Sequence, residues 1–325
     1  MNQHPLPPTM VAPSQRRRGW NVLQIMVTRA CDLACTHCTQ GSNLAGKPVM
    51  MTPEQFEQAC ISLEGYFGIV GMFGGNPAMH PQFDTLCEIM RRWVPFERRG
   101  LWCNNLRGKG AIARMTFNPH SSNINVHLNS EAYAEFERDW PEAIRAREHH
   151  ARNGLTTDSI HSSPWVAIKD VIPDEAERWR MIGQCDVNQN WSALIGIIRG
   201  ELRAFFCEIA YAQAALHADN PNWDNTEKPM PDTGLAVTPG WWRAPMAAYE
   251  QQARLHCQAC GIPMRRAGQL AVGGTKEEFS ETHRWIARPK IKSKPVEFIE
   301  SIGMIRRPER PATEYLAGVT PGFAH

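Results

Sequence analysis

Residues 28–38 have the sequence TRACDLACTHC and directly follow residues 22–27, an apolar run that predicts a buried strand. The stretch holds Cys31, Cys35 and Cys38 in a C-x3-C-x2-C spacing. Ligands of α/β sheets and barrels bind at the edge where the strands end. Three thiolates this close in sequence suit one metal centre, either a zinc loop completed by His37 or a distant residue, or a cluster that leaves one iron open.

Beyond this loop the chain alternates short apolar runs with helical patterns. A capping box of Thr52 and Gln55 with Pro53 at the first helical position predicts a helix start. Predicted strands are 22–27, 68–73, 100–103, 122–128 and 164–168, and predicted helices are 53–67, 83–94, 130–153 with a break at Pro141, and 174–182. This alternation predicts an α/β fold with a mostly parallel sheet.

Polar residues follow several of the predicted strands. Gly74, Gly75, Asn76 and Pro77 come after the second strand, Asn104 and Asn105 after the third, and Lys169 and Asp170 after the fifth. On the fourth strand, Asn123, Asn125, His127 and Asn129 share one face because side chains alternate along a strand. That face either lines a lumen wide enough for a cofactor or belongs to a solvent-facing edge strand.

The cysteine run and the Gly-Gly-Asn-Pro run, in this order on successive strands, resemble the radical S-adenosylmethionine (SAM) enzymes. The resemblance implies a partial (β/α)6 TIM-like barrel in which Cys31, Cys35 and Cys38 hold a 4Fe–4S cluster. It further implies that the open iron binds the amino and carboxylate groups of SAM, with His37 near the adenine. Gly74, Gly75, Asn76 and Pro77 then correspond to the family's Gly-Gly-Glu-Pro run, which contacts the amino group. Asn76 stands where the family has an acid. The amide keeps a carbonyl acceptor but has no charge, so binding of the amino group is expected to be weaker or to be shared with another residue.

The same resemblance implies ribose and carboxylate contacts on the fourth strand, so the further cofactor-binding candidates are Asn104, Asn125 and His127. Reductive cleavage of SAM gives a 5′-deoxyadenosyl radical that removes a hydrogen atom from a substrate C–H bond. The electron for this cleavage comes from a one-electron donor such as a flavodoxin or ferredoxin.

A second set of cysteines lies beyond residue 184, at Cys185, Cys207, Cys257 and Cys260. Here residues 191–199 and 202–206 predict a hairpin, followed by helices at 208–217 and 244–256. Four thiols suit either zinc or a fully ligated cluster. Their order resembles the twitch form of the auxiliary-cluster (SPASM-like) domain of radical SAM enzymes, which implies one auxiliary 4Fe–4S cluster. Cys60, Cys87 and Cys103 are expected in the core.

Four segments are therefore expected: a disordered leader at 1–20, the partial barrel at 21–183, the auxiliary-cluster domain at 184–270, and an extended tail at 271–325. The chain has 325 residues and a formal net charge of +2, which argues against a nucleic-acid partner. No apolar run approaches the ~18 residues of a membrane span, so no membrane partner is expected. The first twenty residues lack the apolar region of a signal peptide, and Arg16, Arg17 and Arg18 resemble a twin-arginine signal only loosely. A reducing cytoplasm is the expected compartment.

The cysteine arrangement most resembles that of the aminocyclitol dehydrogenases, which implies two-electron oxidation of a sugar or aminocyclitol-like small molecule. Lys169 is the candidate base for the hydroxyl proton. One alternative is a maturase that modifies a ribosomally made peptide, although the Pro-rich start cannot form a leader-binding segment. The other alternative, from a different class, is a non-catalytic iron–sulfur or zinc binding module.

Overall fold

A seven-stranded sheet with the strand order β4-β3-β2-β1-β5-β6-β7 organises the structure, a computed structural model. Strands β1 to β4 are parallel neighbours, β5 is parallel to β1, and β6 and β7 are antiparallel. The strands are β1 Val22–Thr28, β2 Ile69–Gly74, β3 Arg99–Cys103, β4 Asn123–Ile124, β5 Ala193–Ile198, β6 Glu201–Phe205 and β7 Leu235–Ala236. The predicted α/β class is confirmed.

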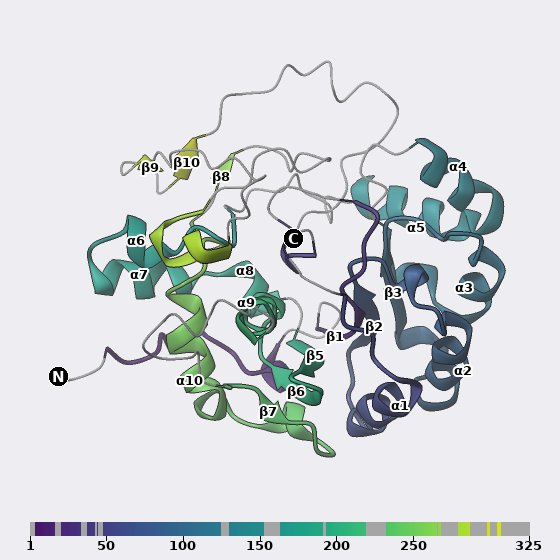
Figure 1. The fold of residues 1–325 in the computed structure, drawn as a ribbon, viewed down its shortest axis with the longest axis horizontal. Coiled ribbons are helices and arrows are strands. Elements are labelled where there is room, and N and C mark those ends of the chain that lie inside the picture. The colour runs from purple at the N-terminus through teal and green to yellow at the C-terminus, as the bar shows by residue number, and fades with distance from the viewer. Residues whose placement is uncertain are drawn as a thin grey trace.

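The structure describes residues 4–16, 21–33, 38–42, 44, 48–124, 130–152, 163–190, 193–218, 232–264, 266–267, 279–286, 298–299 and 304–306. Its α-helices are α1 Pro53–Ser62, α2 Phe83–Trp93, α3 Gly110–Thr116, α4 Ser130–Asp139, α5 Pro141–Arg152, α6 Ile168–Val171, α7 Glu175–Ile182, α8 Asp186–Asn190, α9 Glu208–Ala218 and α10 Glu250–Gln252. Helices α1 to α5 lie on the outer side of β1 to β4 (Figure 1). None of the helices in these ranges is long and apolar enough to cross a bilayer.

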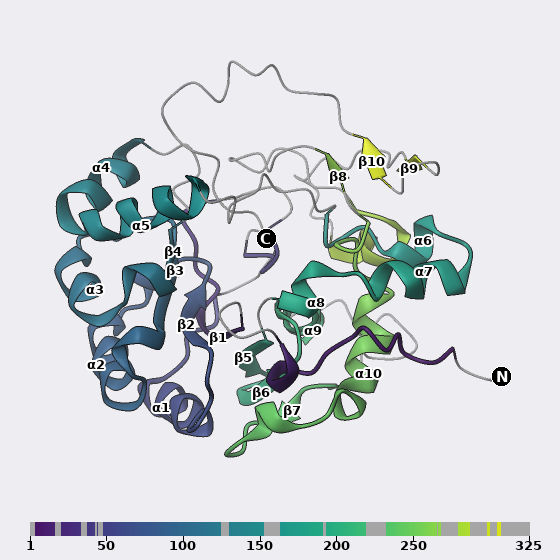
Figure 2. The same ribbon diagram turned by 180° about the vertical axis from the view of Figure 1, so that it is seen from behind.

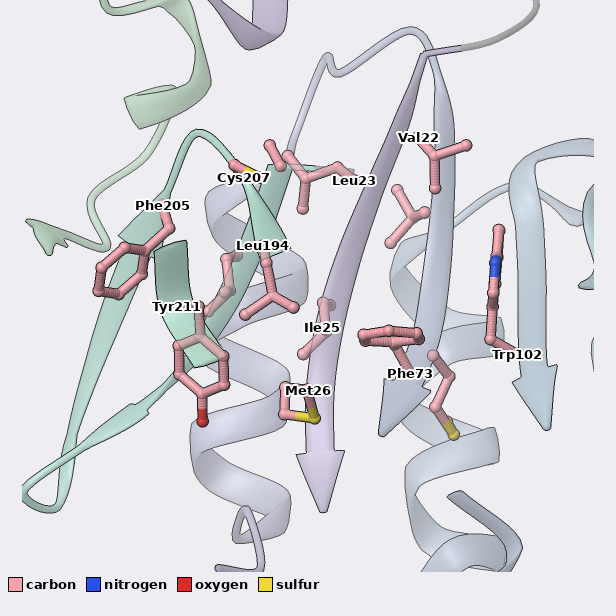
Figure 3. Packing of buried hydrophobic residues seen from close by; sticks show 14 of the residues in the cluster. Val22, Leu23, Ile25, Met26, Phe73, Trp102, Leu194, Phe205, Cys207 and Tyr211 are labelled. Atoms are coloured by element: carbon pink, nitrogen blue, oxygen red, sulfur yellow. The ribbon is translucent and has the colours of Figure 1, made fainter. Parts of the chain in front are cut away.

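Strand β1 is buried along its whole length, between β2 on one side and β5 on the other. Leu23 and Ile25 pair with Ala193 and Ile195 of β5, and the core around them is drawn in Figure 3. A strand covered on both faces has a continuous apolar sequence, which is the pattern that predicted it. The cysteine loop therefore begins in the middle of the sheet, at the end of a fully buried strand.

The predicted hairpin is confirmed as β5 and β6, but Arg199 and Gly200, with φ of 51° and 85°, form its turn, one residue before the predicted turn at Gly200 and Glu201. Two central residues with positive φ suit the right-handed twist of the strands. The hairpin pairs with β1 and extends the main sheet, so strands from the expected barrel and from the expected auxiliary-cluster domain share one sheet. Helix α9 follows it and is buried on all sides, near the centre of the molecule (Figure 2).

The predicted strand at 164–168 is wrong. In the structure, Ile168 and Lys169 donate their backbone N–H groups to the carbonyls of Cys260 and Gln258. Ala167 donates to the Ser280 hydroxyl, at 2.8 Å. These partners come from distant segments instead of a neighbouring strand, and the chain enters the short helix α6.

The expectation of a disordered leader over 1–20 is also wrong for residues 4–16. Met10 and Ala12 are buried, and Pro13–Gln15 form a 3₁₀ helix. Val11 exchanges two hydrogen bonds with the Asn188 side chain, at 3.1 and 3.2 Å. Burial of apolar side chains against α8 orders this segment despite its proline content.

The expected tail is described only in part. Its 3₁₀ helix Glu281–Ile286 is held by Asp170, whose carboxylate accepts hydrogen bonds from Ser280 and from both the backbone and the hydroxyl of Thr282. A small sheet joins β8 Arg266–Ala267, β10 Met304–Arg306 and β9 Phe298–Ile299. Asp170 is thus a structural residue at the base of this segment.

Candidate functional site

Cys31 and Cys38 lie just beyond the end of β1, and both are partly buried. Burial raises the pKa of the Cys31 thiol to about 12, and the nearby Cys38 raises it further. The Leu33 N–H donates to the Cys31 sulfur at 3.4 Å and acts in the opposite direction. Cys35 and His37 lie outside the described residues. A metal ion that binds a thiol converts it to the thiolate, and Cys31 and Cys38 bring two such soft donors to the end of β1.

The Gly-Gly-Asn-Pro run docks on the chain that leads into the cysteine loop. Gly75 donates its N–H to the Thr28 carbonyl at 2.9 Å, and Asn76 donates to the Ala30 carbonyl at 2.7 Å. A Cβ added at Gly74 or Gly75 would stand 2.4 Å from the carbonyl oxygen of Thr28 or Ala30, respectively. Both glycines are therefore required by the close approach of two backbones.

Replacing Gly75 by alanine is expected to destabilise the fold by about 2–3 kcal/mol, because the new methyl group overlaps a backbone oxygen that cannot move aside. Urea unfolding monitored by circular dichroism would measure the change. Gly200→Ala is the matched control, since its Cβ would have no neighbour within 4 Å and only its φ of 85° is unfavourable. We expect about 1 kcal/mol there. Equal losses at the two sites would contradict the steric explanation.

Asn76 is completely buried, and both ends of its amide are used inside the protein. Its Oδ1 accepts from the Ala78 N–H at 3.2 Å and caps the 3₁₀ helix Pro77–Met79. Its Nδ2 donates to Asn105 Oδ1 at 2.9 Å. The predicted position at the strand end is confirmed, and the side chain forms part of the protein interior.

Asp32, in the cysteine loop, accepts hydrogen bonds from the two asparagines that follow β3. Asn104 donates to its Oδ1 at 2.9 Å and Asn105 to its Oδ2 at 2.5 Å. Arg107 lies 3.3 Å from the same Oδ2. Burial raises the pKa of Asp32, but the hydrogen bonds from the two asparagines outweigh it, so the pKa lies below its ordinary value. Asp32 is therefore a carboxylate, hydrogen-bonded on both oxygens.

Glu135 of α4 holds the loop that carries these residues. Its carboxylate accepts backbone N–H bonds from Leu106, Arg107 and Gly108, at 2.8, 3.2 and 2.7 Å. Arg107 and Gly108 have φ of 47° and 75°, which turns successive N–H groups toward one anion. The position of Asn104 and Asn105 thus depends on a helix thirty residues further along the chain.

The structure brings together one part of the predicted cofactor-binding set. Cys31, the run from Gly74 to Pro77, and Asn104 meet at the ends of β1, β2 and β3. Asn125 and His127 lie outside the described residues, and β4 is described only at Asn123–Ile124. Cys60, Cys87 and Cys103 are buried in the core, as predicted.

The candidate base Lys169 is placed differently from the prediction. It lies in α6, not after a strand of the main sheet, and its side chain is exposed. Its backbone N–H contacts the Gln258 carbonyl, so the residue packs against the loop of the second cysteine set. The structure therefore removes the argument that made Lys169 a base, which was its position at the sheet edge.

The second cysteine set converges on one small cavity of about 30 Å³ that opens to solvent. Cys207 immediately precedes α9, and Cys257 ends a π-helix, Ala253–Cys257. The residues lining this cavity, called here the thiol cavity, are Met10, Ile182, Cys185, Val187, Asn188, Phe206, Cys207, Ile209, Ala210, His256, Cys257, Cys260, Ile262 and Pro263. Four thiols from three distant parts of the sequence thus share one apolar chamber.

The thiols of this cavity suppress one another's ionisation. Burial raises the pKa of Cys207 to about 12, and Cys185 raises it further. Burial likewise raises the pKa of Cys257 and of Cys260, with additional contributions from the neighbouring thiols. Across the described residues, no group of three or more His, Cys, Asp or Glu side chains has an arrangement that could hold a metal ion. The cavity brings together four sulfur donors, the ligand type that zinc and iron–sulfur clusters take.

A buried cation lies beside this cavity. The Arg16 guanidinium is 3% exposed and donates to the Phe206 carbonyl. Burial lowers its pKa, while Cys207 and Cys185 are among the groups that raise it. A positive charge next to thiols favours their anionic form, which fits a site built for bound thiolates.

Sequence reasoning missed Asp32 and Arg16 as site residues. Asp32 stands between two predicted ligands, so its place in the cysteine loop was a signal that could have identified it. No local signal marks Arg16, because its neighbours Cys185 and Cys207 lie far along the chain.

Part of the chain is similar to known proteins. No curated protein matches the chain. A solved structure, "Crystal structure of BtrN in complex with AdoMet and 2-DOIA", is similar over 59% of this chain and 74% of that chain, at 11% identity and a TM-score of 0.37. Residues 25–161, which contain the cysteine loop, the Gly-Gly-Asn-Pro run and the asparagines after β3, match the family model described as Radical SAM superfamily.

Proposed function

We propose that this chain is a radical SAM enzyme that oxidises a small molecule by two electrons. The observation that carries the proposal is the docking of the Gly-Gly-Asn-Pro run on the cysteine loop, through Gly75 to Thr28 and Asn76 to Ala30. The docking lies inside the segment that matches the Radical SAM family model. It places the proposed metal-binding thiols beside the ends of β2 and β3, where SAM would bind.

Cys31, Cys35 and Cys38 would hold a 4Fe–4S cluster, and the groups at the ends of β2 and β3 would bind SAM. When bound, a reduced cluster of this kind cleaves SAM to methionine and a 5′-deoxyadenosyl radical. The contribution of the chain itself is to align the target carbon and exclude water, which the buried ends of β1 and β2 favour. An external one-electron donor such as a flavodoxin or ferredoxin supplies the electron for each cleavage.

Cys185, Cys207, Cys257 and Cys260 would hold a second, auxiliary 4Fe–4S cluster in the thiol cavity. Their convergence on one cavity and the buried charge of Arg16 beside Cys207 and Cys185 support this assignment. Zinc is the alternative occupant of the same donors. A second cluster would provide an electron acceptor in the enzyme, which zinc, having no redox chemistry, would not.

The proposed reaction converts a secondary alcohol of a sugar or aminocyclitol-like substrate to a ketone. One hydrogen atom leaves the carbon and joins the 5′-deoxyadenosyl radical to give 5′-deoxyadenosine. A proton would leave the hydroxyl, and a cluster held by Cys185, Cys207, Cys257 and Cys260 would supply the acceptor for the remaining electron. The two electrons removed from the substrate are thus accounted for, and the base that takes the proton is unassigned because Lys169 is exposed in α6.

The test is to incubate the anaerobically reconstituted protein with SAM and dithionite and to measure 5′-deoxyadenosine. Formation above the level of a Cys31→Ala variant is expected. Substrates deuterated at the target carbon would then transfer deuterium into 5′-deoxyadenosine. Release of 5′-deoxyadenosine with a precursor peptide, but with no sugar or aminocyclitol, would favour peptide maturation, and its absence under all conditions would favour a non-catalytic metal-binding module.

A further inference from the structure

The Gly-Gly-Asn-Pro run lacks an acid, yet a carboxylate lies two hydrogen bonds away. We infer that Asp32 supplies the negative charge that binds the α-amino group of SAM. This inference rests on the proposed function and deepens it. Asp32 would be a specificity-determining residue for the amino acid moiety of the cofactor, and Asn76 a positioning residue behind it.

Asn76 itself is poorly suited to the contact. The residue is completely buried. Its Oδ1 accepts a hydrogen bond from the Ala78 N–H, and its Nδ2 donates one to Asn105. A neutral amide would in any case contribute a weaker hydrogen bond to an ammonium group than a carboxylate does. The role of Asn76 in this structure is to hold Asn105.

The side-chain amide of Asn105 connects Asn76 to Asp32. It accepts from Asn76 on Oδ1 and donates from Nδ2 to Asp32 Oδ2. With Asn104 donating to the other oxygen, the carboxylate of Asp32 is oriented by two amides from the end of β3. An oriented, ionised carboxylate loses little freedom when a ligand binds it, which favours affinity.

The carboxylate of Asp32 is accessible to a ligand beside the cysteine loop. It follows Cys31 directly, and its side chain is 26% exposed, in contrast to the fully buried Asn76. Two carboxylate oxygens offer about four acceptor positions, which Asn104, Asn105, the Asp32 backbone N–H and Arg107 contact, so a ligand would take the position of the half-exposed Arg107. An ammonium group brings three donors and a positive charge, which is the chemistry this carboxylate recognises.

The experiment measures the dissociation constant of SAM for reconstituted wild-type and Asp32→Asn proteins by isothermal titration, with iron content determined in parallel. We expect the substitution to weaken SAM binding roughly 10- to 100-fold, the value of a charge-assisted hydrogen bond. Binding of 5′-methylthioadenosine, which has no amino acid moiety, should stay unchanged. Asp84→Asn is the matched control, because Asp84 is an exposed carboxylate paired with Lys109 on the surface, and it should change neither affinity.

Arg107→Met provides an independent test outside the cysteine loop. Arg107 lies 3.3 Å from Asp32 and is half exposed, so it competes with the ligand for the same charge. Its removal should tighten SAM binding by up to about fivefold, which corresponds to the value of an exposed ion pair. A direct contact of Arg107 with the SAM carboxylate would instead weaken binding on its removal.

The outcomes separate this inference from the proposed function. Unchanged SAM affinity in Asp32→Asn, or an equal loss for SAM and 5′-methylthioadenosine, would overturn the role of Asp32 while leaving the enzyme class intact. Weaker SAM binding in Arg107→Met would also overturn it. No SAM binding by the iron-loaded wild-type protein would instead overturn the proposed function.

Discussion

Replacing Cys31, Cys35 and Cys38 together by alanine should reduce the iron content of the reconstituted protein from about eight to about four atoms per chain. Each 4Fe–4S cluster needs thiolate ligands, and these three cysteines are the ligands proposed for the first cluster. Iron and acid-labile sulfide would be measured after anaerobic reconstitution. Formation of 5′-deoxyadenosine should disappear in the same variant, because the cluster that supplies the cleaving electron is lost.

Cys60→Ala is the control for this experiment. Cys60 is buried in α1 within the core and should leave the iron content at about eight atoms per chain. A content of about four irons and one zinc in the wild-type protein would agree with the first cluster. It would contradict the second cluster as electron acceptor, and with it the proposed dehydrogenation. Zinc alone would contradict both iron–sulfur assignments.

Replacing Cys257 and Cys260 together by alanine should remove about four irons per chain and abolish the oxidised product. Cleavage of SAM should continue, because Cys31 and Cys38 lie at the end of β1, in a different part of the fold. The variant would therefore still release 5′-deoxyadenosine, but without the ketone. Mass spectrometry of the products together with iron analysis would measure both effects.

Cys87→Ala is the matched control for the second set, since Cys87 lies in the core at α2 and outside the thiol cavity. It should change neither the iron content nor the product. Retention of all irons in the Cys257 and Cys260 variant would contradict the assignment of these ligands. Loss of all irons would show that the two sites form as one unit.

The sequence alone predicted the elements whose signals are local. The capping box at Thr52 and Gln55 is formed, with each side chain bonded to the other residue's backbone. The Arg199–Gly200 turn connects the predicted hairpin, and the Gly-Gly-Asn-Pro run follows the second strand as expected. These features depend on residues within a few positions of one another, so their spacing carries the information.

The wrong predictions depend on partners distant in sequence. Residues 164–168 are apolar enough for a strand, but Ala167 and Ile168 donate their N–H groups to Ser280 and to the Cys260 carbonyl. Residues 4–16 have the composition of a leader, but Met10 and Arg16 are buried beside the second cysteine set. Neither local propensity nor composition contains these contacts.

The same distinction between local and distant contacts applies to the candidate site. The sequence determined the ligand types, because thiol spacing after a strand limits the chemistry to a few metal centres. Only the tertiary structure decided that four distant thiols share one cavity, and that Asp32, two asparagines and Asn76 form one hydrogen-bonded set. The physical reason is that charge and hydrogen bonding act over a few ångströms in space, and chain folding alone determines which residues come within that distance.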